Sequence, residues 1–517
     1  MNFKNVPSQD IPTHVLIEML SDGWERSHAG LAQELVRRWA AALQAEVWDE
    51  GVWDHVLLFG ASLGHIRMRA MDYVPCCLIS GRANLSGALR DFLKNSVPAD
   101  LPFIFALSAS AYEQAREILP KGRRVIFSVE QVTQLLRSHD PNQFLKLCIR
   151  QQVHRRALVP YNINLPAAGG MFFGRQTEIN RLLEEDFTNF AIVGPGRIGK
   201  TSLLRQYRAK ALRRHARPSR IGFYVSMYDA TPATAARYLA MRIDASRRSD
   251  RVGAGDLINF FRYQAKRRRA PLELLLDEVD NVCRSDAFNY LGEAAKLGLC
   301  RLVMCGRGEL LRVMLSSRST LDARLDLMRV EPLDPHSAVG LILNPLSDLG
   351  FKLEQPELLA EQVLSLTGRL PHLIQHFGKK LTERAIEENS DVISSEHLES
   401  LRGDFLTAQL FIKSLVDLED PRTRLIALCL IESEARSFDI PQIQQVARRE
   451  GISLDLAEIN AVCNDLVIDN VLAWQGGSYT LANEGLPFFA RQLGYLSAAL
   501  AETRTELRAS AQSRHQN

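Results

Sequence analysis

FAIVGPGRIGKTSLLRQ, residues 190–206, joins a short apolar run to a glycine-rich turn and then to a segment with helical spacing. The turn fits the pattern GxxxxGK[ST], with Gly194, Gly199, Lys200 and Thr201 at the fixed positions. A strand before this pattern and a helix after it are the context in which it binds phosphate. Glycines let backbone amides approach phosphate oxygens, and the start of the helix adds partial positive charge. The sequence therefore predicts a nucleotide phosphate site.

The pattern gives each residue of this loop an expected role. Lys200 is expected to reach the β- and γ-phosphates, and the Thr201 hydroxyl is expected to ligate Mg²⁺. A chance glycine turn is the alternative, but the apolar run and the helical segment on either side count against it. The residues expected to contact the nucleotide are Gly194, Pro195, Gly196, Arg197, Ile198, Gly199, Lys200, Thr201 and Ser202.

Two acids end a second apolar segment, PLELLLDEVDNV at 271–282. Its leucines predict a buried strand that ends at Asp277, where a carboxylate can hold the Mg²⁺ shell. Glu278 is then placed to orient and deprotonate the attacking water. Acids also end strands as turn residues, but the phosphate loop favours the catalytic interpretation. We therefore expect Asp277 and Glu278 to be catalytic, with ATP and Mg²⁺ as cofactors.

Arg307 lies just past a third apolar segment, CRLVMCG at 300–306. In an open parallel sheet, ligands bind beyond the carboxyl ends of the strands. Arg307 is therefore a candidate catalytic residue that reaches the γ-phosphate side of the site. The alternative is an exposed arginine that pairs with a nearby acid.

The composition fits a multi-domain globular protein. The chain has 517 residues, too many for one hydrophobic core, and 46% of them are hydrophobic and 24% charged. The net charge of +3 gives no overall attraction to nucleic acid or membrane. Eight cysteines without zinc-ligand spacing, no signal-like N-terminus and no long apolar run predict a cytoplasmic protein without a membrane partner.

Changes in spacing along the chain predict five parts. The segment PYNINLPAAGG at 160–170 reads as a linker, and the apolar spacing becomes mostly helical after about residue 331. The expected parts are an α/β domain at 1–159, a P-loop core with a parallel sheet at 160–333, a helical region at 334–416, a domain of three helices and a hairpin at 417–493, and a polar tail at 494–517.

The N-terminal region alternates helical segments and apolar strands, which predicts an α/β domain. The expected helices are at 29–48, 86–95, 111–119 and 129–138, and the expected strands are at 55–60, 75–80, 103–108 and 124–128.

Together these motifs resemble the AAA+/STAND class of P-loop ATPases, in particular the archaeal-type ATPases, with the origin-recognition ATPases as relatives. MFFGRQTEINRLL at 171–183 is similar to the FxGRxxE box of these families and matches it at Gly174, Arg175 and Glu178. The resemblance implies that this box, and Arg175 in it, helps to hold the adenine.

LTGRLPHLIQ at 366–375 resembles the TGGxP segment of the family's helical lid. Gly368 and Pro371 match it, whereas Arg369 replaces the usual second glycine. Origin-type lids carry an arginine where this chain has Pro371, which favours a STAND-like lid whose proline packs near the nucleotide. An ordinary helix stop is the alternative interpretation of Pro371.

The parts on either side of the ATPase also resemble known folds. The segment 417–493 looks like a winged helix, with the hairpin VLAWQGGSYTLA at 471–482 as its wing. The N-terminal domain loosely resembles the restriction-endonuclease-like fold. Its strand at 75–80, PCCLIS, lacks the acids and lysine that a nuclease needs there, so a degenerate, partner-binding domain is expected.

The resemblance implies a slow ATPase that acts as a switch, whose nucleotide state controls self-association or partner binding, in a setting such as bacterial signalling or defence. Arg318 and Arg324 are candidates for an arginine supplied to a neighbouring subunit. The alternative function is an ATP-dependent DNA-binding loader or transposition-type regulator.

Charge argues against the DNA-binding alternative. Basic runs at 210–220 and 266–270 are more typical of solvated helix ends than of a DNA-binding surface. Residues 451–490, which include the helix that would read DNA, contain no Lys, Arg or His. A helix in the major groove lies between two rows of phosphates and normally carries positive charge.

Overall fold

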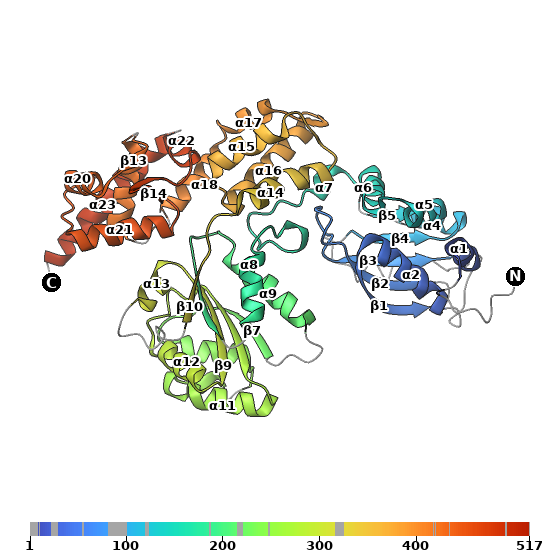
Figure 1. Ribbon diagram of the computed structural model, residues 1–517, viewed down its shortest axis with the longest axis horizontal. Coiled ribbons are helices and arrows are strands. Elements are labelled where there is room, and N and C mark those ends of the chain that lie inside the picture. Colours follow the sequence, from blue (N-terminus) through green and yellow to red (C-terminus); the bar gives the residue numbers. More distant parts are fainter. Residues whose placement is uncertain are drawn as a thin grey trace.

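The computed structural model describes residues 9, 11–21, 29–53, 56–80, 101–118, 122, 124–185, 188–214, 221–246, 249–315, 325–416, 418, 420–433, 435–491 and 494–515. Figure 1 shows an N-terminal α/β domain, a second α/β domain with its own sheet, and a helical C-terminal region. The predicted fold class is confirmed: the second sheet is parallel throughout and the N-terminal α/β domain is separate from it.

The N-terminal domain is built on a five-stranded mixed sheet in the order β1-β2-β3-β4-β5. The pairs β1–β2 and β2–β3 are antiparallel, whereas β3–β4 and β4–β5 are parallel. The described elements of this domain are α1 (Thr13–Ser21), α2 (Ala29–Leu43), β1 (Glu46–Trp53), β2 (Val56–Ser62), β3 (Val74–Ile79), β4 (Phe103–Ala106), α4 (Ala109–Ile118), β5 (Val125–Phe127), α5 (Val129–Arg137), α6 (Pro141–Gln152) and α7 (Arg155–Leu158).

The helix expected at 29–48 is shorter than predicted, because α2 ends at Leu43 and the chain continues as the edge strand β1. Trp48 pairs with Gly60 across the sheet, and its indole lies where a Cβ at Gly60 would be. The ring also packs on Tyr73, with 5.6 Å between the ring centroids. These cross-strand contacts, which are distant in sequence, hold the segment as a strand. The helix expected at 86–95 lies outside the described residues.

The second α/β domain has five parallel strands in the order β10-β6-β9-β8-β7. Alternate residues of β6 face opposite sides: Phe190 and Ile192 pack with α8 and α9, and Ala191 and Val193 pack with α10–α13. The elements are α8 (Gln176–Glu184), β6 (Asn189–Val193), α9 (Lys200–Arg214), β7 (Ile221–Ser226), α10 (Ala235–Ile243), α11 (Leu257–Arg268), β8 (Leu272–Asp277), α12 (Asp286–Lys296), β9 (Cys300–Gly306), α13 (Gly308–Met314) and β10 (Leu325–Arg329).

The C-terminal region begins with the helices α14–α18, which we call the lid helices, and continues with a small sheet in the order β13-β15-β14. The lid elements are α14 (Pro335–Asp348), β11 (Lys352–Leu353), α15 (Pro356–Thr367), α16 (Pro371–Glu387), β12 (Val392–Ile393), α17 (Ser395–Leu401) and α18 (Phe405–Val416). The remaining elements are α19 (Pro421–Glu432), β13 (Ser437–Phe438), α20 (Ile440–Arg449), α21 (Leu456–Ile468), β14 (Leu472–Gln475), β15 (Ser478–Leu481), α22 (Gly485–Arg491) and α23 (Tyr495–His515).

The polar tail expected at 494–517 is instead the helix α23, which packs on α19. Leu496, Ala499, Leu500 and Thr503 are buried and recur every three or four residues, so they form one face of the helix. Arg504 forms a salt bridge with Glu450 at 2.7 Å. The expectation of a tail was wrong because the apolar face is narrow and most other residues of the helix are polar, so the segment as a whole has a polar composition.

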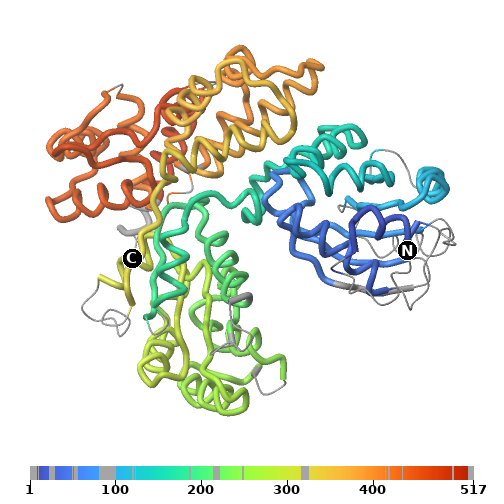
Figure 2. The backbone as a smooth tube through the Cα atoms, turned by 45° about the vertical axis from the view of Figure 1, so that its right-hand side comes forward, coloured from blue at the N-terminus to red at the C-terminus, as the bar shows by residue number. Residues whose placement is uncertain are grey.

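The N-terminal domain is docked on the lid helices through Asp348, at the end of α14. One carboxylate oxygen of Asp348 accepts a hydrogen bond from Lys146 Nζ at 2.5 Å, and the other accepts one from the backbone N–H of Arg67 at 3.0 Å. Tyr161 donates from its hydroxyl to the Ile342 carbonyl at 2.8 Å. In Figure 2 the N-terminal domain accordingly lies beside the lid helices. The two are therefore expected to move together.

Replacing Asp348 with alanine is expected to loosen this docking. The change leaves Lys146 and the Arg67 N–H without their acceptor, which costs about 1–3 kcal/mol when such groups stay buried. Limited proteolysis between the domains, near residues 153–160, should therefore speed up, because cleavage follows the population of the open form. Asp391→Ala is the matched control, because Asp391 pairs with Arg155 at the same interface but its side chain is 73% exposed. Equal cleavage rates in the two variants would contradict a special role for Asp348.

Candidate functional site

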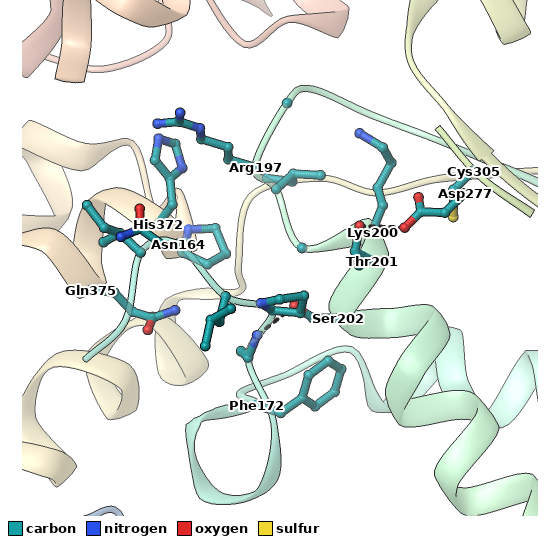
Figure 3. A pocket seen from close by; sticks show the side chains of 18 of the residues that line it. Asn164, Phe172, Arg197, Lys200, Thr201, Ser202, Asp277, Cys305, His372 and Gln375 are labelled. Atoms are coloured by element: carbon teal, nitrogen blue, oxygen red, sulfur yellow. Dashed lines mark hydrogen bonds between the residues drawn. The ribbon is translucent and has the colours of Figure 1, made fainter. Parts of the chain in front are cut away.

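A cavity of about 600 Å³ lies at the edge where β6, β8 and β9 end. Because β9 lies between β6 and β8, the ends of the three strands meet at this edge. The other walls come from 162–167, from 171–173 and from the start of α16. Figure 3 shows Lys200 and Asp277 on one side of the cavity and Gln375 of the lid on the other. The volume is typical of a small-molecule site.

The glycine-rich loop bridges the end of β6 and the start of α9. A Cβ at Gly194 would come within 2.7 Å of the Val330 carbonyl oxygen, and Gly199 has a φ of +102°, so both positions favour glycine. Lys200 Nζ donates to the carbonyls of Gly194 and Pro195, at 2.7 and 2.8 Å. Burial lowers the pKa of Lys200. The ammonium group is thus held inside the loop by acceptors that a phosphate could replace.

Thr201 and Asp277 are brought together at the base of the cavity. The Thr201 hydroxyl donates to Asp277 Oδ2 at 2.6 Å, and the hydroxyl of Tyr224 donates to the same oxygen at 2.9 Å. Asp277 is buried at the end of β8, as the sequence indicated. Hydroxyl and carboxylate oxygens suit Mg²⁺, which in nucleotide sites takes one or two protein oxygens together with phosphates. Accordingly, within the described ranges no group of three or more His, Cys, Asp or Glu could hold a metal alone.

Glu278 differs from its neighbour Asp277 because it is exposed on the cavity wall. Its backbone has a φ of +57°, which is uncommon for a residue other than glycine. The unusual turn directs the chain away from the strand immediately after Asp277. The carboxylate of Glu278 accepts a hydrogen bond from the Ser226 hydroxyl at 3.0 Å. One acid of the pair is therefore enclosed by donors and the other is available to a ligand.

Arg307 lies against the phosphate loop. Its Nη2 is 3.0 Å from the place that a Cβ on Gly196 would take. Both carboxylate oxygens of Asp280 accept from the Arg307 backbone N–H at 2.8 Å, which fixes this turn after β9. In the described part of the chain the guanidinium has no ion pair, so the alternative of an exposed arginine paired with an acid does not hold there. Asp280, which also lines the cavity, was not among the residues predicted from the sequence.

Arg175 contacts the phosphate loop and the segment that follows β10. Its guanidinium donates to the carbonyls of Ile198, at 3.5 Å, and of Glu331, and it pairs with Glu178 at 3.3 Å. It also lines the cavity. These contacts tie the phosphate loop to the segment that follows β10. The contact between Arg175 and adenine that the family resemblance implies stays a prediction.

The segment at 162–167, expected to be a linker, is a wall of the cavity. The Asn162 N–H donates to Gln375 Oε1 of α16 at 3.2 Å, and the Ala167 N–H donates to the Ser202 hydroxyl of α9 at 2.9 Å. The segment therefore connects the lid to the phosphate-loop helix. Pro371, the first residue of α16, lines the same cavity. The residues of 162–167 predicted a linker because Asn and Pro are equally typical of linkers.

Residues 186–314 match a protein-family model described as an AAA domain. The chain contains an AAA domain. The matched segment carries the phosphate loop, Asp277, Glu278 and Arg307, and it supports nucleotide binding and ATPase activity in general. The expected resemblance to AAA+ ATPases is confirmed. Across the described ranges, none of the helices has the length and apolar character needed to cross a membrane.

Solved structures similar to this chain include a Walker-type ATPase and an ORC2 protein. A Walker-type ATPase of Pyrococcus abyssi is 15% identical, with a TM-score of 0.47, and the match covers 62% of this chain and 96% of that one. The ORC2 protein of Aeropyrum pernix, in complexes with ADPNP and ADP, is 15% identical, with a TM-score of 0.46 over 65% of this chain and 95% of that one. No curated protein matches the chain.

Proposed function

We propose that this protein is an ATP-binding and slowly ATP-hydrolysing switch, with Mg²⁺ as its metal. The observation that carries the proposal is the convergence of Lys200, Thr201, Asp277 and Glu278 on one cavity that also contacts the lid. Bound Mg²⁺ would neutralise phosphate charge. A change in mass or shape between nucleotide states, measured in solution, tests the switch.

Each of the site residues named above has a defined task in this proposal. The amides of the loop hold the phosphates, and Lys200 exchanges the carbonyls of Gly194 and Pro195 for phosphate oxygens. Thr201 and Asp277 hold the metal, and Glu278 accepts a proton from the attacking water. Arg307, beside Gly196, faces the charge that develops on the transferred phosphoryl group.

The switch requires that the nucleotide change the position of other parts. The cavity is lined by both the AAA domain and α16, so a bound nucleotide bridges the two. Movement of the lid helices would carry the N-terminal domain, which is docked through Asp348. A site closed by a second domain is a common basis of hinge motion. Nucleotide state would then set the relative positions of the AAA domain and the N-terminal domain.

We propose that α19–α21 with β13–β15 form a winged helix that contacts protein rather than DNA. Asp465 of α21 accepts from Arg312 of α13 at 2.9 Å, so this helix faces the AAA domain. Two of the exposed residues at its start, Asp455 and Glu458, are acidic. Acids facing DNA phosphates would be repelled, and more strongly at low salt. The ATP-dependent DNA-binding loader or transposition-type regulator is therefore the alternative function, and not the one we propose.

An isolated fragment of residues 417–515 is expected not to retain duplex DNA at low salt. This fragment includes α23, whose Leu496 and Leu500 are buried. A variant with Asp455→Lys and Glu458→Lys controls for sensitivity, because it reverses the charge of the same exposed turn. A gel shift by the unmodified fragment that weakens with salt would overturn the proposal and favour the DNA-binding alternative.

Two further parts of the proposal rest on the family resemblance. Self-association, with an arginine from a neighbouring subunit, is proposed, and its candidates Arg318 and Arg324 lie outside the described residues. The setting in bacterial signalling or defence is likewise proposed. The N-terminal domain is proposed to be a degenerate restriction-endonuclease-like fold, supported by its strand order and by β3, which carries no acid or lysine.

A further inference from the structure

The N-terminal domain also contacts a segment next to the cavity of the candidate site. Its loop at 63–73, between β2 and β3, meets residues 169–173, which lead into α8. A Cβ at Gly170 would overlap the Gly64 carbonyl oxygen, so the close approach of the two backbones requires glycine at this position. The N-terminal domain is therefore in direct contact with the chain beside the cavity, in addition to its docking on the lid helices.

Arg67 of this loop joins three parts of the chain. Its backbone N–H donates to Asp348 of α14, and its guanidinium lies 3.7 Å from the same carboxylate. The guanidinium also lies over the ring of Phe173, 5.3 Å from the ring centroid. Such a cation–π contact is stronger where water is excluded. Nε of Arg67 is buried and has no hydrogen-bond partner in the described part of the chain, so the guanidinium contacts the ring in a place shielded from water.

Phe173 belongs to the wall of the cavity at 171–173. Its ring also packs on α14, 3.0 Å from the place that a Cβ on Gly340 would take. Figure 3 shows Phe172 of this wall apart from Lys200. If the phosphates lie at Lys200, as in the proposed function, the wall at 171–173 faces the nucleoside half of the ligand. A side chain of the N-terminal domain thus contacts the nucleoside side of the site.

We propose that Arg67 is a positioning residue for the nucleoside half of the bound nucleotide, supplied by the N-terminal domain. This inference rests on the proposed function. Arg67 holds Phe173 against α14 and so keeps the wall at 171–173 in place before the nucleotide binds. A wall that is fixed in advance loses less freedom on binding, which raises the affinity. By linkage, the nucleotide strengthens the docking of the N-terminal domain by the same factor.

Calorimetry on the full-length chain with ADP and with inorganic pyrophosphate, each with Mg²⁺, tests this role. Arg67→Ala should lower the affinity for ADP by about fivefold or more, the lower end of the usual coupling between two sites. It should leave the affinity for pyrophosphate unchanged, because pyrophosphate has no nucleoside to meet the wall. The KM for ATP should rise, whereas kcat should stay within about twofold, because Arg67 does not itself line the cavity.

Matched variants separate positioning from general effects. Arg69→Ala removes an exposed arginine of the same loop and should bind ADP as the wild type does. Gly170→Ala should lower the affinity for ADP as Arg67→Ala does, because its methyl group displaces the loop at 63–73. Neither Gly170 nor Gly30 has a positive φ, so alanine suits both backbones. Gly30→Ala adds the same methyl group where no atom lies within 4 Å and should have no effect.

Proteolysis measures the reciprocal effect. Cleavage near residues 153–160 should slow when ADP is added to the wild type, because the nucleotide stabilises the docked N-terminal domain. In Arg67→Ala the addition of ADP should slow it much less. An equal effect of ADP on the two proteins would contradict the linkage.

The outcomes distinguish this inference from the proposed function. Equal affinities for ADP in Arg67→Ala and Arg69→Ala, when the wild type binds ADP, would overturn the inference alone. So would an equal loss of ADP and pyrophosphate affinity in Arg67→Ala, because the effect would then not lie at the nucleoside. Absence of both ADP and ATP binding by the wild type would refute the proposed function, and the inference with it.

Discussion

Lys200→Ala should weaken ATP binding by about 100-fold or more. The ammonium group makes charge-assisted hydrogen bonds with phosphate oxygens, each worth about 1.5–3 kcal/mol, and it is also the charge closest to the phosphates. In the described structure it already lies inside the loop, held by the carbonyls of Gly194 and Pro195. Titration with a fluorescent ATP analogue measures the loss.

Lys210→Ala is the control for this change. Lys210 lies on the same helix, α9, and its ammonium donates to the exposed Gln176 side chain at 3.0 Å, outside the cavity. It should bind ATP as the wild type does. Equal ATP affinity in Lys200→Ala and Lys210→Ala would show that the loop does not hold the phosphates.

Glu278→Gln should leave ATP bound but lower the rate of hydrolysis by about 10²–10⁴-fold, the usual contribution of a general base. Glutamine keeps the size of the side chain and its contact with Ser226, but it cannot accept the proton. Asp277, which faces Thr201, is unchanged, so the affinity should change by no more than a few fold. Phosphate release at saturating ATP, together with the dissociation constant, separates the two effects.

Glu331→Gln is the matched control, because the Glu331 side chain is exposed near the loop and the hydrogen bond from Arg175 is accepted by the backbone carbonyl of Glu331. It should hydrolyse ATP normally. Unchanged phosphate release in Glu278→Gln would assign the base to another residue.

The sequence predicted the features whose structure depends on nearby residues. The phosphate loop requires glycine and positive φ over a few positions, so its pattern is readable without the fold. Asp277 and Glu278 follow a leucine-rich strand, and the parallel sheet brings them to the loop, as expected. Gly476 and Gly477 likewise predicted the β14–β15 hairpin.

Features that depend on distant partners were missed. The segment 46–53 is a strand because Trp48 lies over Gly60, and nothing within the segment itself shows that contact. Hydrogen bonds to Gln375 and to Ser202 hold the segment 162–167 at the cavity wall. Gln375 is far along the chain, and Ser202 lies on another helix. Composition alone indicated a linker there, because the same residue types occur in linkers and in cavity walls.

The central claim is that nucleotide state controls the arrangement or assembly of this protein. It is tested most directly by multi-angle light scattering combined with small-angle X-ray scattering on the full chain, with ADP and with a non-hydrolysable ATP analogue. The account predicts that the analogue changes the mass, by a factor of two or more if copies assemble, or changes the radius of gyration at constant mass if the lid and N-terminal domain move. Lys200→Ala should show no difference between the two nucleotides. The same mass and the same radius of gyration in both states of the wild type, with both nucleotides bound, would contradict the account.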